Sequence, residues 1–423
     1  MNHLRILVVL PLYGGSLPIG RYVVSALRDE GHLVEVFEAP EFNEAYESLK
    51  KLKVTTDRLS YLQNSFLNVI SQSVLAKVET FEPDMVLAMA QAPLNQQALK
   101  RLRRDGVTTA MWFVEDYQLF TYWKSYAPLY DIFAVIQREP FLHELEVIGQ
   151  PNALYLPLAA LPEFHKPLEL SPVERRKFGS AVSFMGAGYP NRRRAFRELV
   201  DRDFKLWGTE WEGDHVLMPL VQMQGARVSP EDCVKIFNAT TINLNLHSSI
   251  QAEELVTGGD FINPRTFELA ACGAFQLVDR RALMSEMFED DELAIFESMD
   301  ELVEKITYFL DHPEEMKSIA TKGRERVLQD HTYQARMRTL IDFTAKQIPG
   351  WPKPRNESIL PTEDFPPELA NDIQSLTEKL GLSEDVGFED LVWAVRQQQG
   401  KLSDLDTAIL FLDEWRKLYA KTN

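Results

Sequence analysis

Two polar segments of the chain combine residue types that bind phosphate groups and sugar hydroxyls. The first is SFMGAGYPNRRRAF (183–196), in which an apolar run ends at Gly186. Three consecutive arginines follow, Arg192, Arg193 and Arg194. Glycine keeps a loop free of side chains, and the N–H groups that open a helix attract phosphate. Cations at a helix start oppose the helix dipole, so the cluster predicts an anionic partner such as a diphosphate. Surface salt bridges explain the same pattern equally well.

The second segment, TGGDFINPRTFELAACGAFQLVD (257–279), has the pattern of a flexible glycine loop followed by a helix. Asn263 is a suitable N-cap and Pro264 a suitable first helical residue, which places Glu268 about one turn inside the helix. A carboxylate at this position can accept hydrogen bonds from both hydroxyls of a ribose. The competing interpretation is that Asp260 and Glu268 are ordinary helix-start acids favoured by the dipole.

Three other polar residues end apolar runs. Glu115 and Asp116 close one run, where either can orient or deprotonate an acceptor hydroxyl, although capping is the simpler role. His247 ends INLNLH, where contact with a donor competes with ordinary packing. Asp201 and Asp203 have the spacing of a metal-binding D-x-D pair but fall in a predicted turn, so we expect chemistry without a metal ion.

The composition limits the partners of the protein. Its 45 Lys and Arg against 63 Asp and Glu give a net charge of −18, which disfavours broad binding of nucleic acid. No apolar stretch approaches the ~20 residues of a membrane span, and the first residues lack the pattern of a secretory signal. We therefore expect a cytoplasmic protein. The two cysteines, Cys233 and Cys272, indicate neither a disulfide framework nor a zinc site.

Apolar runs alternate with helical patterns through most of the chain, which is typical of doubly wound α/β domains. Ligands bind at the carboxyl ends of the strands in such domains, and the two segments described above lie at strand ends. A stretch rich in Pro and charge separates two α/β regions, and amphipathic helices follow the second. The predicted parts are a first domain (1–161), a linker (162–179), a second domain (180–348) and a helical extension (349–423).

The run INPRTFELAACGAFQLV resembles the signature of CgeB-like proteins, a spore-protein and glycosyltransferase-family-1-like branch of the GT-B enzymes. Further blocks match in the family's order over about residues 5–345: GGSLPIGRYVVSALRDEGHLVEVFE, MWFVEDY, LYLPLAA, SFMGAGYPNRRRAF and HTYQARM. The resemblance implies the GT-B fold, in which two Rossmann-like doubly wound domains face a cleft. The nucleotide-sugar donor would bind the second domain and the acceptor would face the first.

The resemblance also implies roles for two acids. Related retaining enzymes carry two acids eight positions apart, and Asp260 and Glu268 have this spacing. By this likeness Glu268 binds the donor ribose and Asp260 lies near the transferred sugar. Asp260 stands where the family usually has Glu, which leaves its role and the sugar specificity open.

The diphosphate of the donor would be held by cations and glycines. Arg265 and Arg193 match the positions that neutralise the leaving diphosphate, with Arg192 as the alternative to Arg193. Gly14 and Gly15 match the N-terminal glycine loop of the family.

We therefore expect a retaining, metal-independent glycosyltransferase that needs no cofactor. It would move a sugar from a nucleotide-diphosphate donor to a glycan, a protein or a small molecule. Two alternatives stay open: a GT-B sugar-nucleotide epimerase, and a non-catalytic nucleotide-sugar-binding protein that uses its C-terminal helices to bind a partner. The same helices are candidates for self-association.

Overall fold

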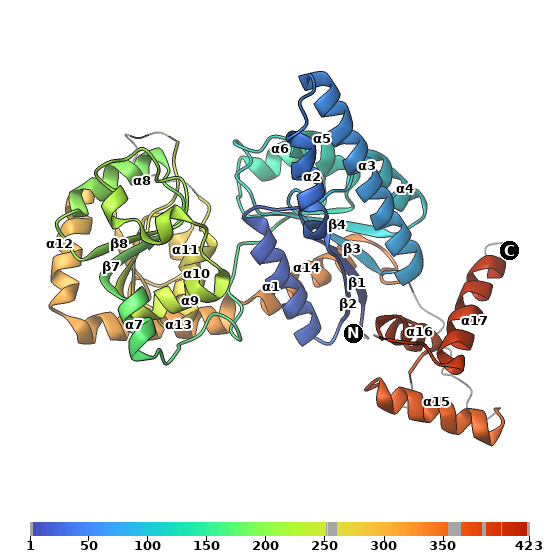
Figure 1. Cartoon of the computed structure of the whole chain (residues 1–423). Helices are drawn as coiled ribbons and strands as arrows, with labels where there is room; N and C mark the ends of the chain where they lie inside the picture. The colour runs from blue at the N-terminus through green and yellow to red at the C-terminus, as the bar shows by residue number, and fades with distance from the viewer. Residues whose placement is uncertain are drawn as a thin grey trace. The chain divides into compact units, whose positions relative to one another are not determined.

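The computed structural model describes residues 3–250, 252, 260–353, 365–382, 386–398 and 400–420. The chain divides into two compact units, Met1–Gly350 and Trp351–Asn423. The first unit contains two parallel sheets, and the described residues of the second form three helices (Figure 1). None of the helices in the described ranges has the length and hydropathy needed to cross a membrane.

A six-stranded parallel sheet in the order β2-β1-β3-β4-β5-β6 forms the first domain. Three of its inner strands, β1, β3 and β5, are buried along their whole length, which explains why they are continuous apolar runs in the sequence. The strands are β1 (Arg5–Val9), β2 (Leu33–Phe37), β3 (Met85–Met89), β4 (Thr108–Phe113), β5 (Ile132–Val135) and β6 (Ala153–Tyr155). The helices are α1 (Ser16–Asp29), α2 (Asn43–Lys50), α3 (Thr56–Phe81), α4 (Gln96–Arg104), α5 (Trp123–Tyr126) and α6 (Phe141–Val147).

A five-stranded parallel sheet in the order β11-β10-β9-β7-β8 forms the second domain. The strands are β7 (Ser180–Met185), β8 (Phe204–Trp207), β9 (Thr240–Asn245), β10 (Gln276–Asp279) and β11 (Ala294–Phe296). The helices that follow or separate them are α8 (Pro190–Ala195), α9 (Pro230–Ala239), α10 (Pro264–Ala271), α11 (Met284–Met287), α12 (Met299–Leu310) and α13 (Pro313–Asp330). The two sheets with their flanking helices confirm the predicted pair of doubly wound α/β domains.

The segment predicted as a linker ends in a short helix, α7 (Pro172–Phe178). Ser171 and Glu174 form a capping box, in which each side chain bonds the backbone N–H of the other residue. Ser171, Pro172 and Glu174 have the spacing of a helix start. The sequence analysis gave more weight to the prolines and charges of the segment and therefore predicted a linker without a helix.

Helix α14 (Tyr333–Gln347) follows the second sheet in sequence but packs against α1 of the first domain (Figure 1). A backbone hydrogen bond joins α14 to the first domain: the N–H of Tyr333 donates to the carbonyl of Ala160. The buried Arg336 donates to the carbonyls of Pro157 and Leu158 and to Nδ1 of His331. The sequence analysis placed residues 333–347 in the second domain, whereas the packing places this helix on the first.

The second unit contains α15 (Pro367–Lys379), α16 (Phe388–Gln397) and α17 (Asp404–Ala420), as the predicted helical extension requires. Leu376, Leu391, Val395 and Ile409 belong to its small core. The buried carboxylate of Asp413 pairs with three cations on α16 and α17, namely Arg396, Arg416 and Lys417.

The contacts of Arg336 predict a strong effect on stability. Arg336→Met leaves carbonyls and a histidine nitrogen without their donor, which lowers the free energy of unfolding by roughly 2–5 kcal/mol. Arg338→Met is the matched control on the same helix, because Arg338 forms an exposed pair with Glu30 that contributes about 0–1 kcal/mol. Urea unfolding of both variants measures the difference, and equal losses would contradict this role of Arg336.

The hydrogen bonds of His331 beside Arg336 predict that the folded protein loses stability in acid. Nδ1 of His331 accepts from Arg336 and its Nε2–H donates to the carbonyl of Met287, so the folded state holds the neutral ring. Burial, and next Arg336, lower the pKa of His331 from 6.5 to about 4. Above pH 6.5 the ring is neutral in both states; as the pH falls toward 4 only the unfolded state gains the proton. The free energy of unfolding therefore falls by up to about 3 kcal/mol between these limits.

Unfolding of wild-type protein and His331→Gln in urea at pH 7.5 and pH 4.5 isolates this contribution. We expect the stability difference between the two proteins to shrink at the lower pH, because the variant carries no titrating ring at this position. A difference that is independent of pH would show that His331 does not titrate in this way.

Candidate functional site

The start of α10 is fixed to the end of strand β9. The side chain of Asn263 caps the helix by accepting from the N–H of Thr266, 3.1 Å away, and its amide donates to Asn245 Oδ1 at 2.8 Å. Asn245 is the last residue of β9 and also donates to the Thr266 hydroxyl at 2.9 Å. The first turn of α10 therefore lies at the carboxyl end of the sheet, where open α/β folds bind ligands.

His247, a predicted donor contact, takes part in the same support. Its Nδ1 lies 2.7 Å from Asp279 Oδ1, and its Nε2 accepts from the N–H of Asn263 at 3.0 Å. Burial lowers the pKa of His247, and these partners suit a neutral ring that donates through Nδ1. Both ring nitrogens of His247 therefore bond protein groups that hold α10 in place. Neither nitrogen is left to contact a nucleotide-sugar donor.

Arg265 and Glu268 project from the first turns of α10 as a pair. Nη1 of Arg265 lies 2.7 Å from Glu268 Oε2, and the guanidinium packs over the ring of Phe237. The other oxygen of Glu268 lies 3.8 Å from His165 Nε2. The ring of His165 packs edge-on against Tyr22 of α1, with their centroids 4.8 Å apart, so the Glu268 carboxylate lies close to the first domain.

The glycine loop of the first domain leaves open space at the start of α1. Gly14 has a φ of +106°, which favours glycine, and a Cβ placed on Gly14 or Gly15 would meet no atom within 4 Å. Nη2 of Arg227, from the second domain, donates to the carbonyl of Gly14 at 3.1 Å. Sequence analysis missed Arg227, because a lone exposed arginine before α9 carries no spacing pattern.

Asp116 and Asp260, both predicted catalytic residues, share one amide partner. Nε2 of Gln137 lies 3.4 Å from Asp116 Oδ2 and 3.3 Å from Asp260 Oδ1. The backbone N–H of Arg138 also donates to Asp260, at 3.1 Å. The other oxygen of Asp116 accepts from backbone N–H groups two and three residues later, which is the capping role considered from the sequence. Gly258 and Gly259, predicted as a flexible loop before Asp260, lie outside the described residues.

Arg193, predicted to face a diphosphate, donates instead to backbone carbonyls. Its Nε donates to Gly188 at 2.7 Å and its Nη1 to Glu212 at 3.0 Å, and Nη2 bonds the carbonyl of Glu210. These bonds tie the loop after β7 to the loop after β8. A guanidinium has five N–H donors, which suits such a cluster of carbonyls. In the sequence alone, an arginine that binds carbonyls looks the same as one that binds an anion.

Arg192 and Gly186 belong to the same loop packing. Arg192 donates to the carbonyls of Leu246 and Ala187 at 2.9 and 3.0 Å. A Cβ on Gly186 would lie 3.0 Å from the ring of Phe184. The contacts of both residues are internal, so the predicted cluster is split: Arg265 and Glu268 lie on α10 beside the first domain, whereas Arg192 and Arg193 stabilise loops.

In the part of the chain that the structure describes, no group of three or more His, Cys, Asp or Glu side chains is arranged to hold a metal ion.

Comparisons with known proteins agree with this architecture. Residues 192–342 match a family model described as "Glycosyl transferase-like". The chain is 26% identical over 270 residues to the spore protein CgeB of Bacillus subtilis, and the match covers 61% of this chain and 82% of that protein.

Two solved structures have the same fold. A glycosyltransferase from Rickettsia africae superposes with a TM-score of 0.54 at 14% identity, covering 81% of this chain and 98% of that one. Anabaena HepE, solved in complex with UDP-glucose, superposes with a TM-score of 0.56 at 13% identity, covering 81% of this chain and all of that one. With its two parallel sheets the chain has the GT-B fold, residues 192–342 are similar to glycosyl transferase-like proteins, and the chain is similar over 270 residues to the spore protein CgeB.

Proposed function

We propose that this protein transfers a sugar from a nucleotide-diphosphate donor to an acceptor with retention of the anomeric configuration. The observation that carries the proposal is the Arg265–Glu268 pair at the start of α10, which His165 connects to Tyr22 of the first domain. The solved complex of HepE with UDP-glucose, a protein of the same fold, supports a nucleotide sugar as the donor.

In this proposal the diphosphate binds at two helix starts, where the helix dipole favours negative charge. One is the first turn of α10 and the other is the Gly14–Gly15 start of α1, where no side chain occupies the space. Arg265 and Arg227 add positive charge, which the negative charge developing on the leaving group requires. Glu268, paired with Arg265, accepts hydrogen bonds from the ribose hydroxyls.

The transfer breaks the bond between the anomeric carbon and the diphosphate oxygen, and the bond's electrons leave with the diphosphate. The acceptor oxygen forms the new bond on the same face of the sugar, and its proton passes to the departing phosphate oxygen. Asp260 lies near the sugar in this scheme. Its carboxylate is held by Gln137 and Arg138 of the first domain, and Asp116 positions Gln137.

We expect the variant Glu268→Gln to fold and to bind UDP with an affinity lower by about 1.5–3 kcal/mol, because the ribose contacts lose their charge assistance. Glu297→Gln is the matched control, since Glu297 forms an exposed pair with Arg280 away from α10. Calorimetric titration of UDP and GDP into both variants measures the effect. Unchanged nucleotide affinity in folded Glu268→Gln would exclude the ribose role.

We also expect turnover to survive EDTA, because arginine side chains and backbone N–H groups supply the charge stabilisation in this proposal. The assay follows release of UDP from UDP-glucose and UDP-N-acetylglucosamine before and after chelation. Activity that disappears with EDTA and returns with Mg²⁺ or Mn²⁺ would overturn the metal-independent mechanism.

The same assay separates the alternative functions when the products are identified by NMR. A transferase releases UDP, slowly to water and faster to an acceptor. An epimerase converts the donor sugar into its isomer, and a binding protein leaves the donor intact while still showing UDP affinity by calorimetry.

A further inference from the structure

Helix α17 of the second unit has an apolar stripe on its outer face. Its inner face packs into the core of the three helices through Ile409, and the buried Asp413 lies next to the cations of the same unit. The outer face carries five large side chains that stay exposed: Phe411 at 67%, Leu412 at 49%, Trp415 at 53%, Leu418 at 73% and Tyr419 at 62%. We refer to these five residues as the α17 stripe.

The spacing of the stripe is that of a helix–helix contact. Successive residues of a helix turn by about 100°, so all five side chains fall within an arc of about 120° around the axis. From Phe411 to Trp415 is four residues, and from Trp415 to Leu418 is three, which is the repeat by which one helix packs along another. The rings of Trp415 and Tyr419 lie 5.1 Å apart and form the middle of a continuous surface.

The charges beside the stripe pair within the second unit itself. The carboxylate of Asp413 pairs with Arg396, Arg416 and Lys417, and Glu414 accepts from Arg396 at 2.6 Å. The stripe therefore offers a partner apolar surface and aromatic rings in place of an unmatched charge. Helix α17 also contains four acids and two bases, whereas the helices that anionic lipid surfaces attract are basic.

The area of the stripe is large enough for a dimer. An aromatic side chain covers roughly 150–250 Å², so the exposed fractions of the five residues add up to on the order of 500 Å². Monomeric proteins rarely expose larger apolar patches. Two such stripes in contact bury about 1,000 Å² in total, which is the lower limit of a specific protein–protein interface.

We propose that the α17 stripe binds the same stripe of a second copy of this chain, so that the second unit is a dimerisation module. A two-fold axis places one patch on both sides of such an interface. The stripe matches itself, because one leucine and one aromatic residue lie on each side of Trp415. Two antiparallel copies centred on Trp415 set aromatic residues against aromatic residues and leucine against leucine. The proposal does not depend on the proposed function.

The mass of the whole chain in solution tests the proposal. Sedimentation equilibrium over a wide range of protein concentration should show a mass that rises from one copy to two. Trp415→Gln removes the central aromatic residue, and we expect it to raise the dissociation constant of the dimer by about thirtyfold or more. The double variant Trp415→Gln/Leu418→Gln should stay monomeric. Neither residue belongs to the core of the unit, so circular dichroism should show unchanged helix content.

Tyr61→Gln is the matched control. Tyr61 lies on α3 of the first domain and is 66% exposed, so the substitution removes a similar apolar surface away from the stripe. We expect Tyr61→Gln to leave the dissociation constant of the dimer unchanged.

A chain that stays monomeric at every concentration would overturn the proposal. The proposal also fails if Trp415→Gln and Tyr61→Gln dimerise as strongly as the wild-type protein, because another surface then forms the dimer. Cosedimentation of a monomeric chain with phosphatidylcholine or phosphatidylglycerol vesicles, lost in Trp415→Gln, would assign the stripe to a lipid surface instead. UDP affinity enters none of these outcomes, so the proposed function is tested separately.

Discussion

Buried carbonyl groups need hydrogen-bond donors, and in this chain arginine side chains supply them where the backbone leaves the regular strands. Arg336 donates to the carbonyls of Pro157 and Leu158 and thereby ties α14 to the first domain. Arg193 does the same between two loops of the second domain. These contacts connect α14 to the first domain and the loop after β7 to the loop after β8, and the candidate site lies beside both.

This use of arginine explains which contacts can be derived from the sequence and which cannot. Consecutive arginines in an acidic chain predict an anion site, but a guanidinium binds several carbonyls as well as it binds a phosphate. Only the fold shows that the loops after β7 and β8 meet around Arg193. In contrast, the pairing of Arg265 with Glu268 follows from helical spacing, since residues three apart lie on the same face. The chemistry of local pairs was therefore predictable, and that of long-range clusters was not.

The fold shows the same contrast between features with a local sequence signal and features that depend on distant segments. The central strands β1 and β3 are buried along their whole length, and such apolar runs, alternating with helical patterns, identified the parallel sheets from the sequence. The return of α14 to the first domain has no local signal, because it depends on partners such as Pro157 that are distant in the chain. Arg227 and Gly14 also come from separated segments, and no spacing rule connects them.

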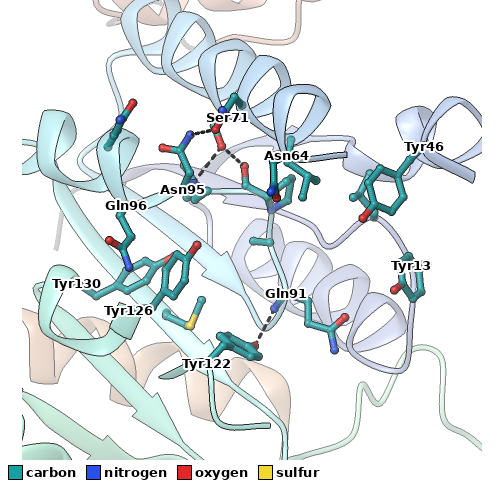
Figure 2. A pocket seen from close by; sticks show the side chains of 18 residues that line it. Tyr13, Tyr46, Asn64, Ser71, Gln91, Asn95, Gln96, Tyr122, Tyr126 and Tyr130 are labelled. Atoms are coloured by element: carbon teal, nitrogen blue, oxygen red, sulfur yellow. Dashed lines mark hydrogen bonds between the residues drawn. The ribbon is translucent and has the colours of Figure 1, made fainter. Parts of the chain in front are cut away.

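The proposed donor site matches its ligand in charge. On α10, Arg265 and the helix start favour a diphosphate, and Glu268 favours hydroxyl groups that approach as donors. A cavity of about 580 Å³ in the first domain has a different lining, of tyrosines and amides, with the Glu115 carboxylate behind them and the Lys50 ammonium over the rings of Tyr13 and Tyr46 (Figure 2). Charge on α10 is therefore arranged within one helical turn, whereas the cavity draws its polar groups from separated segments of the first domain.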